Sequence, residues 1–271
     1  MMQKMLTSLS NPTVKALRAM HEKKGRKGGQ FLAEGLKIVL SAIENGWVPQ
    51  KIVVSLAEEK NKHIKKLLHD LPYGVEVLWA NASVMEKISA RDNPQAVMGV
   101  FAQQFCGLEK VDIQKRVVVL ENVRDPGNLG TIIRTADAAG VGAVMLVGET
   151  CDPFGLEAVR ASMGSIFAVP LARVTLKEFI DWRKNLPAHV PVVGTHLKAT
   201  QDYRRIKWGQ GPQQGGVLVM GGEQHGMSDE ISCTCTTLVK IMMHGTADSL
   251  NLAVATGILL FHASAAPDSE S

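Results

Sequence analysis

The sequence predicts an α/β protein with two domains, the larger of which contains a parallel sheet. Continuous apolar runs such as residues 117–120 are typical of strands covered on both faces, as in parallel sheets. These runs alternate with helical patterns, which is the order of βαβ units. A stretch without clear periodicity separates the two halves, and 271 residues are enough for two modest domains.

The first half has the pattern of a smaller α/β domain, expected over residues 1–105. Asn11 and Pro12 mark a helix start, because asparagine caps helices and proline suits the first helical position. Short apolar runs predict strands, and apolar residues three or four apart predict helices. The expected strands are 31–33, 52–54, 75–78 and 97–101, and the expected helices start at Pro12 or span 36–42 and 58–69.

The second half, residues 115–271, is expected to form the larger domain after a linker at 106–114. The expected strands are 117–120, 143–147, 190–193, 217–220 and 238–242. A helix is expected from about residue 129 to 139, and a nearly all-apolar helix over 250–263. Because that last helix has no obvious polar face, we expect the sheet, a partner subunit or both to bury it.

Composition excludes several classes of protein. No apolar stretch approaches the roughly 20 residues of a membrane span, and the first eleven residues lack the apolar core of a signal peptide, so we expect a cytoplasmic protein. The four cysteines, at 106, 151, 233 and 235, are too few and too irregular for a disulfide framework. Cys233 and Cys235 have no second ligand pair at zinc-like spacing, so we expect reduced thiols and no metal site.

Positive charge is concentrated at the start of the chain. Residues 1–109 contain 15 Lys/Arg and 10 Asp/Glu, whereas the remainder contains 15 and 16. Four of these cations lie close together in a glycine-containing segment: Lys23, Lys24, Arg26 and Lys27. They are candidates for contact with a polyanion such as RNA, and the alternative is a solvated helix face with a basic loop.

Three segments in the second half combine small or amide residues with one strongly polar group. The first, 122–130, leaves a strand and enters a helix, the usual ligand position in α/β sheets. It lacks the glycine pattern of a dinucleotide site and of a phosphate loop. Arg134 is expected in about the first turn of that helix, either in an ion pair or directed at a phosphodiester, which a guanidinium fork suits.

The other two segments also follow apolar runs. Gly221 and Gly222 end one run, and glycine there lets a ligand approach the main chain. Glu223 follows them and could cap the helix expected near Ser228 or serve the site. Ser249 is a natural N-cap for the last helix, whereas Asn251 is expected to be a buried amide that joins the loops or touches substrate.

Together these segments resemble a known family. Asn128-x-Gly130-x-x-x-Arg134, the segment from Gly221 to Ser228, and Ile241 through Met243 to Asn251 are similar to the three motifs of the SpoU/TrmH branch of the SPOUT RNA methyltransferases. The resemblance covers residues 116 to about 263. Residues 28–37 resemble the start of the RNA-binding domain found in members that modify ribosomal RNA.

The resemblance implies a SPOUT domain with a trefoil knot, an obligate homodimer, and transfer of a methyl group from S-adenosylmethionine to a ribose 2′-hydroxyl. It implies that Arg134 acts on the ribose hydroxyl and its phosphate in the partner's site, and that Asn128, Glu223, Ser249 and Asn251 shape the site. The residues it assigns to the cofactor are Gly221, Ile241, Leu250, Thr195, His196 and Met243. Met242 stands where the family usually has proline, which would give a looser loop on the adenine side.

Several functions remain open at this point. The basic N-terminal domain favours large-subunit ribosomal RNA as substrate. Within the same enzyme class, the substrate could be transfer RNA, or the methylation could confer antibiotic resistance. A different class is a non-catalytic RNA-binding or ribosome-assembly factor, which Met242 would favour and the complete polar set opposes.

Overall fold

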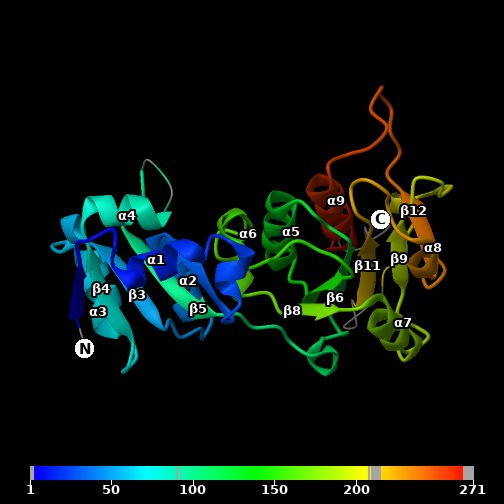
Figure 1. The fold of residues 1–271 in the computed structure, drawn as a ribbon. Coiled ribbons are helices and arrows are strands. Elements are labelled where there is room, and N and C mark those ends of the chain that lie inside the picture. Colours follow the sequence, from blue (N-terminus) through cyan, green and yellow to red (C-terminus); the bar gives the residue numbers. More distant parts are fainter. Residues whose placement is uncertain (1–2, 90, 92, 207, 209–214, 265–271) are drawn as a thin grey trace, which may run out of the picture. The chain divides into compact units, whose positions relative to one another are not determined.

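The computed structural model describes residues 3–89, 91, 93–206, 208 and 215–264, and it divides into two compact units. The first unit comprises residues 1–104 together with 152–168, and the second comprises 105–151 together with 169–271. The chain therefore passes between the units three times. Each unit has its own sheet (Figure 1).

The first unit is built on a five-stranded sheet. In spatial order its strands are β1 (Gln3–Leu6), β4 (Glu76–Ala80), β3 (Lys51–Ser55), β5 (Val97–Ala102) and β2 (Gln30–Glu34). β5 pairs antiparallel with both of its neighbours, and the other pairs are parallel. Four of the five strands match the runs expected from sequence. In the fifth, β1, Lys4 and Met5 are exposed and Leu6 is buried, and the strand gives little apolar signal.

Helices surround this sheet. They are α1 (Pro12–Ala19), α2 (Leu36–Glu44), α3 (Lys62–Asp70) and α4 (Ala82–Ser89), with 3₁₀ turns η1 (Lys23–Arg26) and η2 (Leu56–Glu58). Asn11 caps α1 as expected, its side chain accepting from the Thr13 N–H at 2.8 Å. The expected helix 58–69 is too long, because Asn61 caps a new helix after η2. The expected basic loop at Lys23 is the turn η1.

A segment from the second half of the sequence completes the core of the first unit. It contains α6 (Leu156–Ala161) and the 3₁₀ turn η4 (Ser165–Phe167) (Figure 1). Phe154 and Phe167 are buried and lie 4.8 Å and 5.8 Å from Phe31, measured between ring centroids. The Trp47 indole N–H donates to the Phe167 carbonyl at 2.9 Å. The core of this unit is therefore built from two separate stretches of chain.

The second unit contains a seven-stranded sheet in which every pair is parallel. In spatial order its strands are β10 (Gln201–Asp202), β12 (Thr237–Lys240), β9 (Val192–Thr195), β11 (Gly216–Met220), β6 (Arg116–Glu121), β7 (Ala143–Val147) and β8 (Leu171–Val174). The central strands β6, β7 and β11 are wholly buried, as the continuous apolar runs predict.

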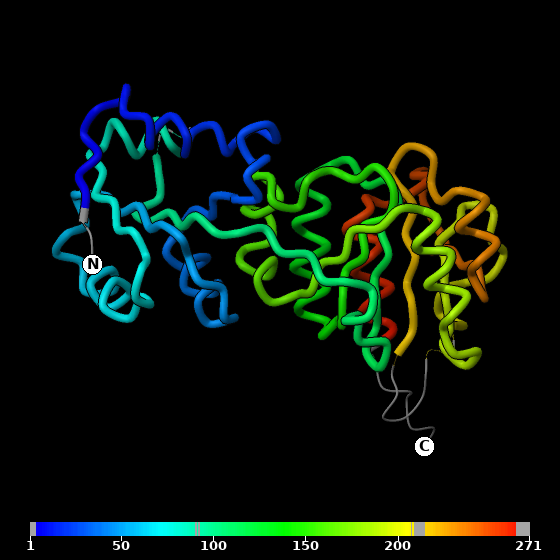
Figure 2. The backbone as a smooth tube through the Cα atoms, turned by 60° about the horizontal axis from the view of Figure 1, so that its bottom comes forward, coloured from blue at the N-terminus to red at the C-terminus, as the bar shows by residue number. Residues whose placement is uncertain are grey.

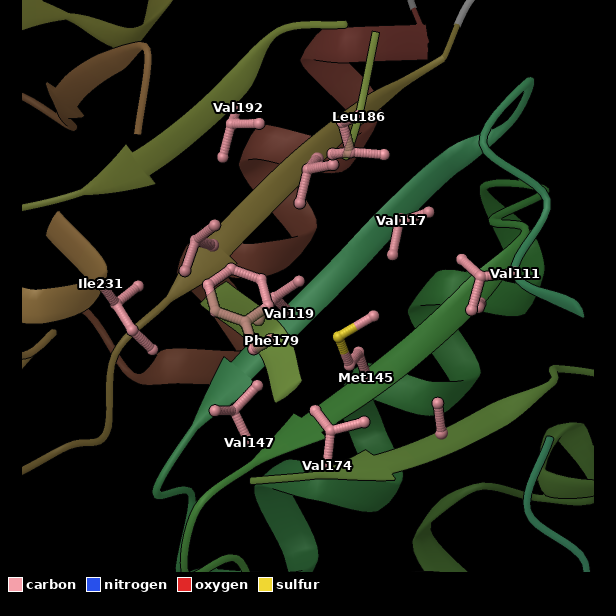
Figure 3. Packing of buried hydrophobic residues seen from close by; sticks show 14 of the residues in the cluster. Val111, Val117, Val119, Met145, Val147, Val174, Phe179, Leu186, Val192 and Ile231 are labelled. Carbon is pink, nitrogen blue, oxygen red and sulfur yellow. The ribbon is translucent and has the colours of Figure 1, made fainter. Parts of the chain in front are cut away.

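The two faces of this sheet carry different helices. They are α5 (Pro126–Ala138), α7 (Leu176–Lys184), α8 (Asp229–Ser232) and α9 (Leu252–Ser264), with the turns η3 (Leu108–Lys110) and η5 (Tyr203–Arg205). On one face, Phe179 of α7 and Ile231 of α8 pack with Val117, Val119 and other strand residues (Figure 3). Residues 106–114, expected as a linker, pack against this core through buried Val111.

α5 and α9 lie side by side in the second unit (Figures 1 and 2). α9 is not buried all round: Val254 and Phe261 are 52% and 53% exposed in the single chain. None of the helices in the described part of the chain has the length and apolarity to span a bilayer. The trefoil knot stays a prediction of the resemblance.

Candidate active site

The three sequence segments lie along one edge of the parallel sheet. In the order β12, β9, β11, β6, the strands end at Lys240, Thr195, Met220 and Glu121. Because these strands are parallel, the residues that follow them emerge at the same carboxyl edge. Ile241, His196, Gly221 and Asn122 therefore occupy neighbouring positions there.

The loop after β11 folds tightly back on itself. Gly222 and Gly226 form an antiparallel bridge, and Gly226 has a φ of 68°. A Cβ on Gly221 would lie 2.1 Å from the backbone of Gly226 and Met227, and a Cβ on Gly222 would lie 2.9 Å from the Asn122 carbonyl oxygen. Only glycine fits at Gly221, and the close approach holds the loop against the end of β6.

A chain of hydrogen bonds joins all three segments. The Asn128 side-chain amide donates to Glu223 Oε1 at 3.0 Å, and the Asn251 amide donates to Asn128 Oδ1 at 2.9 Å. Asn128 lies in the first turn of α5, which begins earlier than expected because Asp125 caps it and Pro126 follows. The expectation that these turns converge is confirmed. Glu223 accepts from Asn128, whereas Ser228 caps α8.

Two expectations about the last segment are wrong. Asn251 is exposed, not buried, and it performs the capping expected of Ser249. Its Oδ1 accepts from the N–H groups of Ala253 at 2.9 Å and Val254 at 3.3 Å. An asparagine that both caps α9 and bonds to Asn128 ties the start of α9 to the start of α5. Ser249 is exposed and makes no side-chain hydrogen bond to a described residue.

Arg134 lies well along α5, beyond its expected place in about the first turn. The side chain is exposed and makes no ion pair or hydrogen bond with any residue that the structure describes. Its guanidinium is therefore available for a ligand or a second protein chain. The ion-pair alternative has no support within the described chain.

The residues assigned to the cofactor gather near the same edge. Ile241, Met243 and Leu250 are apolar and at least partly exposed, Leu250 by 37%. Thr195 is the last residue of β9 and His196 follows it, and the Lys198 N–H donates to His196 Nδ1 at 3.1 Å. Apolar side chains beside a glycine-bearing main chain suit an adenosyl group, which needs apolar walls and backbone hydrogen bonds. These residues fit S-adenosylmethionine.

Sequence reasoning missed Glu121, the last residue of β6. Its carboxylate is buried in the second unit, and its Oε2 accepts from the Ser228 N–H at 2.8 Å. Through this bond it holds the far end of the loop that begins at Gly221. The sequence did contain a signal for Glu121, because this carboxylate directly follows a run of four apolar residues. A carboxylate buried at the end of such a strand needs a hydrogen-bond partner.

Cys235, one of the two cysteines near residue 234, is held as a neutral thiol. Burial raises the pKa of the Cys235 thiol to about 12, which disfavours the thiolate that a metal ligand needs. Among the described residues, no group of three or more His, Cys, Asp or Glu side chains is placed to hold a metal ion.

The four cations expected to contact RNA differ in their burial. Lys23, Lys24 and Lys27 are exposed on or next to η1. Arg26 is buried: its guanidinium pairs with Asp152 at 2.9 Å and donates to the carbonyl of His21 at 2.9 Å. Arg26 thus holds α1, η1 and the inserted segment together and is not free for RNA, contrary to the expectation.

Comparison with known proteins identifies both parts of the chain. Residues 115–261 match the SpoU rRNA Methylase family, and residues 11–99 match an MRM3-like substrate binding domain. The crystal structure of an AdoMet-bound rRNA methyltransferase from Sinorhizobium meliloti is 46% identical, with a TM-score of 0.86, and the match covers 96% of this chain and 97% of that one.

Two curated relatives carry more specific names. One is the 23S rRNA (guanosine(2553)-2′-O)-methyltransferase RlmP of Bacillus subtilis (strain 168), which is 32% identical over 96% of this chain and 98% of its own. The other is the 23S rRNA (uridine(2479)-2′-O)-methyltransferase of Streptomyces viridochromogenes, 28% identical over 89% and 84%. With a converged site, a matching domain and a relative of nearly equal extent, the chain belongs to the SpoU rRNA methylase family.

Proposed function

We propose that the protein transfers a methyl group from S-adenosylmethionine to a ribose 2′-hydroxyl of 23S ribosomal RNA. The observation that carries the proposal is the hydrogen-bonded chain Asn251–Asn128–Glu223, which unites three segments at the carboxyl edge of the sheet. Both curated relatives are named for 2′-O-methylation of 23S rRNA. Because one is named for guanosine and the other for uridine, the proposal concerns the ribose and not the base.

Arg134 is proposed to activate the ribose hydroxyl. A hydroxyl is a poor nucleophile, so the site must orient it and stabilise the negative charge that develops on its oxygen. A guanidinium stays protonated and cannot act as a general base, but it donates to an oxygen and to a neighbouring phosphate. A phosphate of the RNA is proposed to accept the proton. The free, exposed guanidinium supports this role.

The remaining site residues are proposed to bind and orient. When bound, S-adenosylmethionine supplies the methyl group. Gly221, Ile241, Leu250, Thr195, His196 and Met243 would hold it at the carboxyl edge. Asn128, Glu223 and Asn251 would fix the loops on which the ribose rests, through the hydrogen bonds that join them. Ser249, whose side chain is exposed, would help to shape the same site.

We also propose that residues 1–105 form the domain that recognises RNA, that residues 106–114 connect the two domains, and that residues 115–271 form the catalytic SPOUT domain. The match of residues 11–99 to a substrate binding domain supports the first part. Lys23, Lys24 and Lys27 are proposed to contact the RNA backbone, and Arg26 leaves that set because it is buried. A ribosomal RNA substrate would place the protein in the cytoplasm.

We also propose that two copies pair through α5 and α9. Val254, Ile258 and Phe261 share one face of α9, and two of the three side chains are more than half exposed. Gly257 lies against Thr135 of α5, so this face adjoins the helix that carries Arg134. Covering the apolar face with a second copy would place Arg134 at the boundary between subunits, where it could serve its partner's site.

The first test changes Arg134 to alanine. The variant should lose methylation of 23S rRNA while its affinity for S-adenosylmethionine, measured by calorimetry, stays within about twofold, because the guanidinium acts on charge that develops in the transition state. Methylation at near wild-type rate would remove Arg134 from the mechanism. Loss of cofactor binding as well would show that it acts on the cofactor instead.

A mixing experiment tests whether Arg134 acts across the dimer. Arg134→Ala is combined with Gly221→Ala, which damages the cofactor loop but keeps Arg134. If Arg134 serves the partner's site, a mixed dimer contains one complete site and activity returns. If each subunit uses its own Arg134, no complete site forms and the mixture stays inactive. A monomer in analytical ultracentrifugation would contradict the dimer directly.

A further inference from the structure

The strongest unexplained feature of the first unit is a group of arginines around one buried carboxylate. Glu34 ends β2, and its side chain is fully buried. Arg160 of α6 donates from Nε to Glu34 Oε2 at 2.9 Å and from Nη2 to the Ser89 carbonyl at 3.2 Å. The Ser89 hydroxyl also donates to Glu34. Arg91 Nε lies 3.8 Å from the same carboxylate oxygen, too far for a good hydrogen bond.

The group carries more positive charge than this carboxylate can balance. Arg18, in the last turn of α1, is half-buried and makes no ion pair with a described residue. Both Arg18 and Arg160 act on His21, which follows α1, and α1 packs against α4. Burial lowers the pKa of His21, the Arg18 and Arg160 guanidinium groups lower it further, and a backbone hydrogen bond at Ile88 and the Glu34 carboxylate oppose them.

The imidazole also has an unsatisfied atom. His21 Nε2 is buried and has no hydrogen-bond partner among the described residues. Buried polar atoms normally have one. Because the ring donates to the Ile88 carbonyl, the unpaired Nε2 of the neutral imidazole is an acceptor, so His21 itself is not a phosphate ligand. An arginine near a helix C-terminus is a common stabilising arrangement, and it accounts for Arg160 at the Ser89 carbonyl. This arrangement does not explain the positions of Arg18 and of the partly exposed Arg91.

We propose that Arg18, Arg91 and Arg160, where α1, α4 and α6 end, form a binding site for a backbone phosphate of the RNA substrate. Partly exposed guanidinium groups present planar forks that match phosphate oxygens. Arg160 is held in place by Glu34, while Arg91, 41% exposed, and Arg18 keep free donors. The exposed lysines of η1 begin two residues after His21, beyond the exposed carboxylate of Glu22.

This inference rests on the proposed RNA substrate, and it adds a site outside the catalytic edge. It also selects one side of the first unit. α3 also carries exposed lysines, Lys65 and Lys66, but no buried carboxylate or unsatisfied side-chain atom accompanies them among the described residues. α3 therefore provides a matched control with the same loss of charge in the same unit.

The test compares Arg18→Gln/Arg91→Gln with Lys65→Gln/Lys66→Gln in the full chain. Binding of purified 23S rRNA is measured by filter retention at several salt concentrations. The arginine pair should weaken binding at least about tenfold, comparable to one lost charge-assisted hydrogen bond, and lower the salt slope by about 1–2. The lysine pair should change affinity less than about threefold. Arg18→Lys/Arg91→Lys should retain part of the affinity.

The outcomes separate this site from the proposed function. Equal effects of the two pairs, or a larger effect of the lysine pair, would overturn the phosphate site and indicate general charge attraction. Wild-type protein that neither binds nor methylates 23S rRNA would instead contradict the proposed function. Thermal melting of each variant confirms that the fold is kept, since the Arg160–Glu34 pair is left intact.

Discussion

At the scale of single residues, the site depends on close approach of main chain. Gly221 leaves no room for a side chain, because a Cβ would overlap the backbone at Gly226 and Met227. Gly245, in the loop between β12 and α9, has nothing within 4 Å of the same atom. The same change to alanine therefore causes a steric clash at Gly221 and none at Gly245.

We predict that Gly221→Ala abolishes detectable binding of S-adenosylmethionine, since the backbone of the loop must shift to admit the methyl group. Gly245→Ala should leave the dissociation constant within about threefold, because a single methyl in open space costs little. Calorimetry on both variants measures this. Equal affinities for the two variants would show that the loop after β11 does not hold the cofactor.

Glu121 is the second residue on which the loop depends. Glu121→Ala leaves the Ser228 N–H without its partner, at a cost of about 1–3 kcal/mol in unfolding free energy. We predict weaker cofactor binding, because the loop from Gly221 to Ser228 loses one anchor. Glu121→Gln keeps an acceptor oxygen and should restore most of the affinity. If both variants bind as the wild type does, Glu121 serves stability alone.

At the scale of elements, sequence patterns located the strands that are buried on both faces. β6, β7 and β11 match their predicted runs because continuous apolar sequence has few other uses. β9 begins at Val192, after the predicted start, since Pro191 has no N–H for the ladder. β1, β8 and β10 were not predicted, because they are short and partly polar.

Two helices in the second half of the sequence, α6 and α7, were not predicted. α7 has a capping box, in which Thr175 and Glu178 bond to each other's backbone N–H, and this Thr-x-x-Glu pattern could have revealed it. α6 has only six residues and gives no usable periodicity. No local pattern shows that α6 and η4 pack into the first unit, because that depends on contacts with residues more than a hundred positions away.

The inserted segment yields a prediction at this scale. Phe154→Ala should destabilise the first unit by about 3–5 kcal/mol, since the ring is buried against Phe31. Tyr73→Ala, an exposed aromatic of the same unit, should change stability by less than about 0.5 kcal/mol. Chemical denaturation, followed by limited proteolysis to identify the unit that opens, distinguishes them. Equal stability of the two variants would contradict a core shared by the two stretches.

At the scale of the whole molecule, the sequence predicted which residues belong to the candidate site. It did not predict the hydrogen bonds that join them. The amide and carboxylate residues of the three segments were found by their position after apolar runs. That Asn128 bonds to both Glu223 and Asn251 follows only from the strand order of the sheet. The sequence predicted that the sheet, a partner subunit or both bury α9, and it did not distinguish these two covers. In the single chain one face of α9 is exposed.

The central claim is that the converged edge transfers a methyl group to ribose. The most direct measurement incubates the purified protein with S-adenosylmethionine and 23S rRNA from cells that lack the gene, then identifies the modified nucleoside by mass spectrometry. The account predicts one nucleoside methylated on the ribose 2′-oxygen, and none with Arg134→Ala. A methyl group on a base, or no transfer by the wild type to naked RNA or to the ribosomal particle, would contradict it.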